Sequence, residues 1–158
     1  MRHFALLYGE DADKWGVIGL IHDIDYEKHP DQHCAKAGEI LKEKGFPDDY
    51  IHAVQSHAWG IASDVEPTER MEKVLYAIDE LTGLITAIVL MRPSKSVLDL
   101  KLSSVKKKWK QKSFAAGADR EIIAKGAQML GIELDELIQQ TIKGMQSAAE
   151  TLGLKGEA

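Results

Sequence analysis

The residues that suggest chemistry in this chain of 158 residues are its six histidines and the acidic residues near them. His22 and Asp23 directly follow the apolar run Gly-Leu-Ile, so an imidazole and a carboxylate lie at the edge of a hydrophobic core, where such groups need partners. A carboxylate can bridge two cations while an adjacent imidazole binds one of them. With further His and Asp residues nearby, this pair predicts a site for one or two metal ions.

The other histidines differ in how well they suit such a site. His33 begins one predicted helix and His57 ends another, and each lies on the side that its apolar neighbours turn inward, so both are ligand candidates. His52 lies about 140° from His57 around an ideal helix, so we assign His52 to the surface. Pro30 biases the preceding His29 away from helical geometry, which makes His29 a predicted loop residue.

Three acidic residues are further candidates. Asp79 interrupts an apolar stretch, where an unpaired buried carboxylate would be costly, so either a cation accompanies it or it faces solvent beside Glu80. Asp25 and Glu27 follow the His-Asp pair closely. Their catalytic roles would be to orient a ligand histidine or to act as a general acid, and the alternative is that they cap a helix or pair with Lys28.

Helices must position these residues, because apolar residues recur at spacings of three and four almost throughout the chain. The intervening stretches are short and rich in Gly, Pro and Asp, which predicts an all-α protein. The predicted helices run from Asp11 or Asp13 to Ile21, over 30–44, over 47–57, over 69–91 with Thr68 as cap, from Ser103 or Ser104 through a short basic run, from Asp119 to 130, and over 133–152. The helix 69–91 is apolar on most sides and is therefore predicted to be the central one.

Composition narrows the class of protein. A hydrophobic fraction of 44% with 28% charged residues is ordinary for a globular protein of one domain. No apolar run approaches the roughly 20 residues of a membrane helix, and the N-terminus lacks the pattern of a signal peptide, so we expect a cytoplasmic chain with no membrane partner. A net charge of −5 argues against general nucleic-acid binding. Cys34 is the single cysteine, so a hydrophobic core rather than disulfides must supply stability.

The order of these residues resembles the HD superfamily of metal-dependent phosphohydrolases, above all its small stand-alone members. The likeness rests on Gly-Leu-Ile-His-Asp-Ile-Asp-Tyr-Glu at 19–27, on His33, on Ser56-His57, and on Tyr-Ala-Ile-Asp-Glu-Leu-Thr-Gly at 76–83, and it extends to 92–95 and 104–117. The resemblance implies an all-α HD-domain helical bundle around a metal site. It implies one domain over 1–158, with a metal-binding core over about 12–91 and C-terminal helices over about 96–153.

The resemblance also implies the ligands and the reaction. Asp23 would bridge two metal ions, His22 and Asp79 would bind one of them, and His33 and His57 the other. One or two divalent ions fit this pattern, and Fe, Mn, Co, Zn and Mg are all candidates. A water between the ions would attack the phosphorus of a small phosphorylated substrate, either a phosphate ester or an anhydride such as a nucleotide.

One histidine of the family pattern is absent. By the family's spacing it would precede Met1, and His3 would lie about ten helical residues, or about 15 Å, beyond the expected place. The resemblance therefore implies that the chain starts inside the family's first helix, either because the true start lies upstream or because the chain is a natural truncation. Apolar surface exposed in this way would favour a homo-oligomer.

A run of lysines forms the strongest cluster of positive charge; its members are Lys106, Lys107, Lys108, Lys110 and Lys112. Such a run is usually a solvated helix face. The functional alternative is that Lys108 and Lys112, which are neighbours at helical spacing, bind the phosphate of the substrate.

Two other functions compete with the phosphohydrolase. The first is an HD-type di-iron oxygenase, because some members of the superfamily hold two irons with the same ligands. The second is a degenerate, non-catalytic HD module, because the first histidine ligand is absent.

Overall fold

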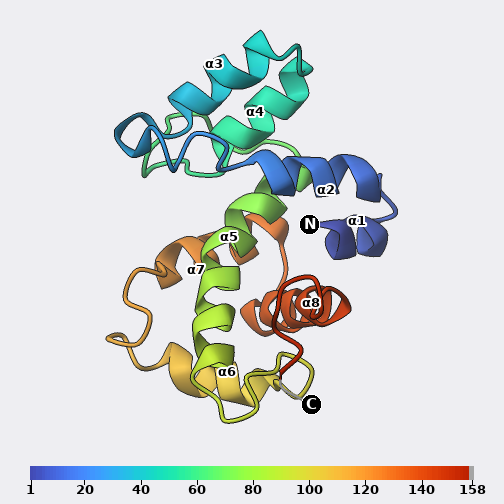
Figure 1. Ribbon diagram of the computed structural model, residues 1–158, viewed down its shortest axis with the longest axis vertical. Helices are drawn as coiled ribbons and strands as arrows, with labels where there is room; N and C mark the ends of the chain where they lie inside the picture. The colour runs from blue at the N-terminus through green and yellow to red at the C-terminus, as the bar shows by residue number, and fades with distance from the viewer. Residues whose placement is uncertain (157–158) are drawn as a thin grey trace. The chain divides into compact units, whose positions relative to one another are not determined.

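The computed structural model describes residues 1–156, and over these residues it contains eight α-helices and no β-strand beyond isolated bridges, which confirms the all-α prediction (Figure 1). The elements are α1 (Arg2–Tyr8), α2 (Ala12–Ile21), the 3-10 turn η1 (Pro30–Gln32), α3 (Ala35–Glu43), α4 (Asp48–Ser56), α5 (Arg70–Leu90), α6 (Leu102–Trp109), α7 (Arg120–Leu130) and α8 (Leu134–Ser147). The chain divides into two compact units, Met1–Tyr76 and Ala77–Ala158, and α5 runs through the division. None of the helices in the described residues is both long enough and apolar enough to cross a bilayer.

Two predicted helix starts and one predicted end are confirmed. The carboxylate of Asp11 accepts hydrogen bonds from two backbone N–H groups in the first turn of α2, and Asp119 does the same for α7. Gly131 ends α7 with φ of 68°, a left-handed conformation that glycine adopts at little cost.

The helix predicted over 30–44 is wrong at its start. Pro30–Gln32 forms only a 3-10 turn, and α3 begins at Ala35. The intervening Cys34 has φ of 67°, which lies outside the right-handed helical region and interrupts the helix. The helical spacing of the apolar residues did not indicate this break.

The helix predicted over 133–152 is wrong at its end, because α8 stops at Ser147. The chain then continues through turns, and the N–H of Val97 donates a hydrogen bond of 2.8 Å to the carbonyl oxygen of Leu154. A longer helix would have carried Leu154 away from this partner. A contact distant in sequence therefore overrides the local helical pattern.

The predicted cap of the basic helix is wrong too. The N–H groups of Ser104 and Val105 donate to the carbonyl oxygen of Lys101, so the helical hydrogen bonds of α6 begin there. Ser103 and Ser104 lie inside the helix rather than at its N-cap.

In the first unit, α1 packs on α2, α2 packs on α4, and α3 packs on α4. Apolar side chains at the contact of α3 with α4 form a buried cluster; its members are Ala37, Leu41 and Val54, with Ile21, Phe46 and Ile51 packed against it. This packing holds the end of α2, the start of α3 and the end of α4, which are the segments near the candidate histidines.

In the second unit, α6 and α7 pack on α8, and the C-terminal part of α5 is buried on most sides. Gly126 of α7 lies directly against α5: a Cβ atom at this position would be 2.5 Å from the Cα and Cβ atoms of Ala77. The close approach of the two helices therefore requires a residue without a side chain.

The backbone N–H groups at the start of α5 donate to the buried carboxylate of Glu72, whereas the predicted cap was the side chain of Thr68. Glu72 has a relative exposure of 3%, and its Oε2 accepts hydrogen bonds from the N–H groups of Thr68 and Glu69 at 2.7 and 3.0 Å. Its Oε1 lies 2.6 Å from Nδ1 of His52. The side chain of His52 keeps a relative exposure of 43%, which fits its assignment to the surface, and it is bonded to the cap of α5.

Two glycine substitutions on helices of the second unit should act in opposite directions. Gly126→Ala should lower the free energy of unfolding by about 1–3 kcal/mol, because the added methyl group must displace the backbone of α5. Gly83→Ala should raise it by up to about 1 kcal/mol, because Gly83 lies in α5, is exposed and has no neighbouring atom within 4 Å of the place that a Cβ atom would take. Urea denaturation measures both, and equal effects would contradict the close packing.

The Glu72 cap should give stability that depends on pH. Burial by itself raises the pKa of Glu72, but hydrogen bonds from Glu69, His52 and Thr68 outweigh it and hold the pKa below its ordinary value. A carboxylate with a lowered pKa stabilises the fold above its unfolded pKa of about 4.3, and this contribution is lost as pH falls through the folded pKa. Glu72→Gln should therefore cost about 1–3 kcal/mol at pH 7 and progressively less between pH 5 and pH 3.

Denaturation of both proteins across this pH range tests the Glu72 prediction. Glu69→Gln is the matched control, because the side chain of Glu69 is exposed and only its backbone takes part in the cap. A cost of Glu72→Gln that stays constant down to pH 3 would contradict the assignment.

Candidate metal centre

Two of the candidate histidines sit at equivalent positions at helix ends. His22 follows the last residue of α2, and His57 follows the last residue of α4. In each case Nδ1 donates a hydrogen bond to the carbonyl oxygen three residues earlier, that of Gly19 at 2.9 Å and that of Val54. Carbonyl groups in the last turn of a helix have no helical partner, so these bonds satisfy them. Because an oxygen of this kind only accepts, Nδ1 carries the proton of the neutral ring, and Nε2 is the atom that can take up a cation or a second proton.

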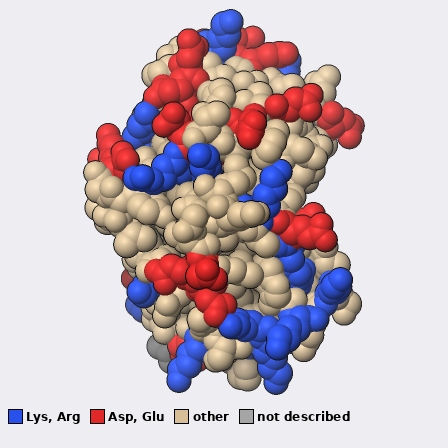
Figure 2. Space-filling view, turned by 180° about the vertical axis from the view of Figure 1, so that it is seen from behind, with Lys and Arg blue, Asp and Glu red and all other residues tan. Residues whose placement is uncertain are grey.

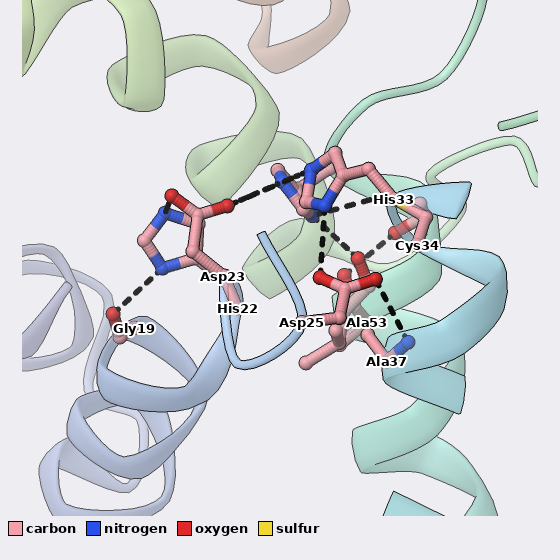
Figure 3. A network of polar contacts seen from close by, with 11 residues as sticks. Gly19, His22, Asp23, Asp25, His33, Cys34, Ala37 and Ala53 are labelled. Atoms are coloured by element: carbon pink, nitrogen blue, oxygen red, sulfur yellow. Dashed lines mark hydrogen bonds and ion pairs between the residues drawn. The ribbon is translucent and has the colours of Figure 1, made fainter. Parts of the chain in front are cut away.

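His33 is held in the same tautomer by a different partner. Its Nδ1 lies 2.9 Å from Oδ1 of Asp25, a carboxylate with a relative exposure of 0%. The other carboxylate oxygen, Oδ2, accepts a hydrogen bond of 2.9 Å from the N–H of Ala37 in the first turn of α3. Figure 3 shows Asp25 between the imidazole and this turn. Of the roles predicted for Asp25, the geometry favours orientation of a ligand histidine.

The backbone between His33 and α3 makes a tight turn. Cys34 has φ of 67° and ψ of −46°, and the N–H of Ala35 donates to the carbonyl oxygen of His33 at 2.9 Å, which is a γ-turn. The buried Sγ of Cys34 lies 3.9 Å from Nδ1 of His57. One possible ligand atom from each of His33, Cys34 and His57 lies within 4.8 Å of the other two, although the Nδ1 of His57 that is near the thiol already donates to Val54.

The Nε2 atoms of the three histidines converge on Asp23. His33 Nε2 and His57 Nε2 are 3.1 Å apart and lie 3.6 and 3.5 Å from Oδ1 of Asp23. His22 Nε2 lies 3.4 Å from the other oxygen, Oδ2. Figure 3 shows the carboxylate of Asp23 between His22 on one side and His33 on the other.

This convergence fits a divalent cation. Two lone pairs 3.1 Å apart repel each other unless a proton or a metal ion lies between them. Two nitrogen ligands on one tetrahedral zinc, each bound at about 2.0–2.1 Å, are separated by roughly 3.3 Å, which is close to the spacing found. The side chain of Asp23 has a relative exposure of 49%, so a small molecule can approach the cluster.

The cluster is built to stabilise positive charge. The hydrogen bond with His57 holds the pKa of Asp23 below its usual range, and the charges of His22 and His33 add to this effect. Burial lowers the pKa of His57, but its contacts with Asp23 and Cys34 outweigh burial and raise the pKa to about 10. Asp23 is therefore ionised at neutral pH, and a metal ion bound to His57 would replace a proton that the same carboxylate stabilises.

The structure places the other predicted residues as follows. Asp79 is half-buried on α5, in the second unit, and its role as a metal ligand stays a prediction. Glu27 is exposed in the turns after α2, and within the described part of the chain it makes no hydrogen bond or ion pair. Its predicted catalytic role stays a prediction.

The predicted phosphate-binding lysines belong to the second unit. Lys108 Nζ lies 4.7 Å from the ring centroid of Phe114 and donates to Gln111, while Lys112 is exposed. The loop 110–118 is held by the guanidinium of Arg120, which donates to the carbonyl oxygens of Trp109, Gln111, Phe114, Ala115 and Ala118. Basic side chains gather along the lower edge of the face in Figure 2, at the level of α6 in Figure 1. Phosphate binding by Lys108 and Lys112 stays a prediction.

Sequence reasoning missed the backbone partners of the cluster. The carbonyl groups of Gly19 and Val54 are invisible to motif analysis because any residue type can supply them. The signal that would have found them is a histidine directly after the last residue of a predicted helix, where its Nδ1 can reach the preceding turn.

Comparison with known proteins shows the family of the chain. A family model described as the HD domain matches residues 1–84, just over half of the chain, and this range contains all five predicted metal ligands. No curated protein and no solved structure matches the chain.

Protein purified without chelator and without a metal-affinity tag should contain one or two divalent transition-metal ions per chain. Asp23→Ala should lose them, because this carboxylate faces all three imidazoles. Asp31→Asn, which changes an exposed carboxylate in η1, should keep them. Plasma mass spectrometry measures the metal content, and a full complement of metal in Asp23→Ala would refute the cluster as the binding site.

Proposed function

The chain belongs to the HD-domain family, whose members are mostly metal-dependent hydrolases, and we propose that it is a phosphohydrolase acting on a phosphate ester or anhydride. The observation that carries this proposal is the convergence of the Nε2 atoms of His22, His33 and His57 on the two oxygens of Asp23. A centre of this kind is suited to hydrolysis because bound divalent cations acidify a water molecule and neutralise phosphoryl oxygens.

The residues of the first unit would hold the metal ions in two groups. Oδ1 of Asp23 faces His33 and His57, and Oδ2 faces His22, so a single carboxylate serves both groups. The family resemblance adds Asp79 to the His22 group. Imidazole-rich ligands favour Mn, Fe, Co or Zn over Mg, which prefers oxygen ligands and bound water.

The substrate class follows from the openness and charge of the centre. Asp23 is half-exposed, so the phosphoryl group of a small substrate would approach from this side. A nucleotide is a suitable candidate, since its phosphate groups would meet two cations at once. We propose Lys108 and Lys112 as additional phosphate-binding residues.

A di-iron oxygenase is the second candidate because the same imidazole and carboxylate ligands suit iron. The two functions differ in what they consume. A phosphohydrolase releases phosphate and needs no oxygen, whereas an oxygenase consumes oxygen and requires iron.

The purified chain, loaded with Mn²⁺ or Co²⁺, should release phosphate from at least one member of a panel of nucleotides and sugar phosphates. Asp23→Ala and His22→Ala should reduce the release to background, because each removes a ligand from the cluster. Asp31→Asn should retain activity and serves as the control. Colorimetric phosphate release measures the outcome.

Two results would overturn the proposal. Full phosphatase activity in Asp23→Ala would show that phosphate is released elsewhere or by a contaminant. Two bound irons with oxygen consumption and no phosphate release would assign the chain to the oxygenases instead.

A further inference from the structure

Asp25 sets His33 apart from the other two histidines of the cluster. The Nδ1 atoms of His22 and His57 donate to neutral backbone carbonyl groups. The Nδ1 atom of His33 donates to a carboxylate that is fully buried. The three imidazoles are therefore not equivalent as metal ligands, although all present Nε2 to the same centre.

A carboxylate behind an imidazole strengthens it as a ligand. The negative charge stabilises the positive charge that develops on the ring when Nε2 binds a cation, and the hydrogen bond fixes the ring orientation. A carbonyl group supplies the second effect but only a small part of the first. Nε2 of His33 is thus the stronger donor, and Nε2 of His22 the weaker one.

His33 is also held more rigidly in advance of metal binding. The second oxygen of Asp25 accepts from the N–H of Ala37, which ties the turns after α2 to the start of α3. The γ-turn at Cys34 fixes the backbone on the other side of His33. The side chains of His33 and His57 have relative exposures of 9% and 2%, against 20% for His22. The ligands on the His33 side therefore lose less conformational freedom when an ion binds.

We propose that the two metal positions differ in affinity, and that the first ion binds between His33, His57 and Oδ1 of Asp23. The second ion binds on the His22 side at Oδ2. Asp25 is the positioning residue that creates the difference, through its bond to His33. This inference rests on the metal centre of the proposed function and goes further by giving the order in which its positions fill.

The order of filling is tested by titrating metal-free protein with Co²⁺ alone, followed by isothermal calorimetry and by the visible absorption of bound Co²⁺. The wild-type chain should bind in a tight step and a weaker step. His22→Ala should remove the weaker step and leave the tight one, and His33→Ala should remove the tight one. If only one ion binds to the wild type, it should survive His22→Ala and be lost in His33→Ala.

The role of Asp25 is tested in the same titration with Asp25→Asn, which keeps the shape of the side chain but removes its charge. The tight step should weaken by about 10–100-fold while the weaker step keeps its affinity. Asp31→Asn is the matched control, because it makes the same change at an exposed position a few residues from His33. A thermal melt checks that each variant folds; if Asp25→Asn does not, the two histidine variants still decide the order of filling.

The outcomes separate this inference from the proposed function. Loss of the tight step in His22→Ala, two wild-type steps of equal affinity, or equal weakening of both steps by Asp25→Asn would each overturn the order of filling while leaving the metal centre intact. No binding of Co²⁺ by the wild-type chain would overturn both.

Discussion

The candidate metal centre depends on one constraint, which is that every cluster histidine carries its proton on Nδ1. A neutral imidazole offers a lone pair only from its unprotonated nitrogen. An acceptor that bonds to Nδ1 of each ring therefore decides that Nε2 is the nitrogen with the lone pair. Gly19, Val54 and Asp25 supply these acceptors. Without them, the three Nε2 atoms would have no fixed protonation and no fixed direction.

The ends of two helices in the first unit supply acceptors that hold the proton on Nδ1. A helix end has carbonyl groups that need donors, and a histidine placed directly after the helix satisfies one of them while its ring is oriented. The same arrangement occurs at the ends of α2 and α4. His33 follows only the 3-10 turn η1 and precedes α3, and its Nδ1 bonds to the side chain of Asp25 rather than to a backbone carbonyl group. A buried carboxylate and a γ-turn take the place of that carbonyl.

Glu72, another buried carboxylate of the first unit, has the same kinds of hydrogen-bond partners as Asp25. Glu72 is nearly inaccessible and is stabilised by backbone N–H groups and by His52 at the start of α5, just as Asp25 is stabilised by His33 and the start of α3. Each buried carboxylate joins a histidine to the first turn of a helix. Burial of a charge is tolerable in both places because both oxygens of each carboxylate meet donors.

The sequence by itself determined the helical class, most helix positions, the cap Asp119, the choice of Asp11 or Asp13 as the cap of α2, and membership of the HD family, because these depend on local spacing and on a specific order of residues. It also singled out His22, Asp23, His33 and His57. Only the tertiary structure decided that Cys34 interrupts a helix, that α8 ends early, that Glu72 binds His52, and that Asp25 bonds to His33. The end of α8 and the bond between Glu72 and His52 depend on contacts between residues far apart in sequence, and such contacts exist only once the chain has packed. The turn at Cys34 and the bond between Asp25 and His33 are closer in sequence, but their backbone conformation leaves no pattern in the spacing of apolar residues.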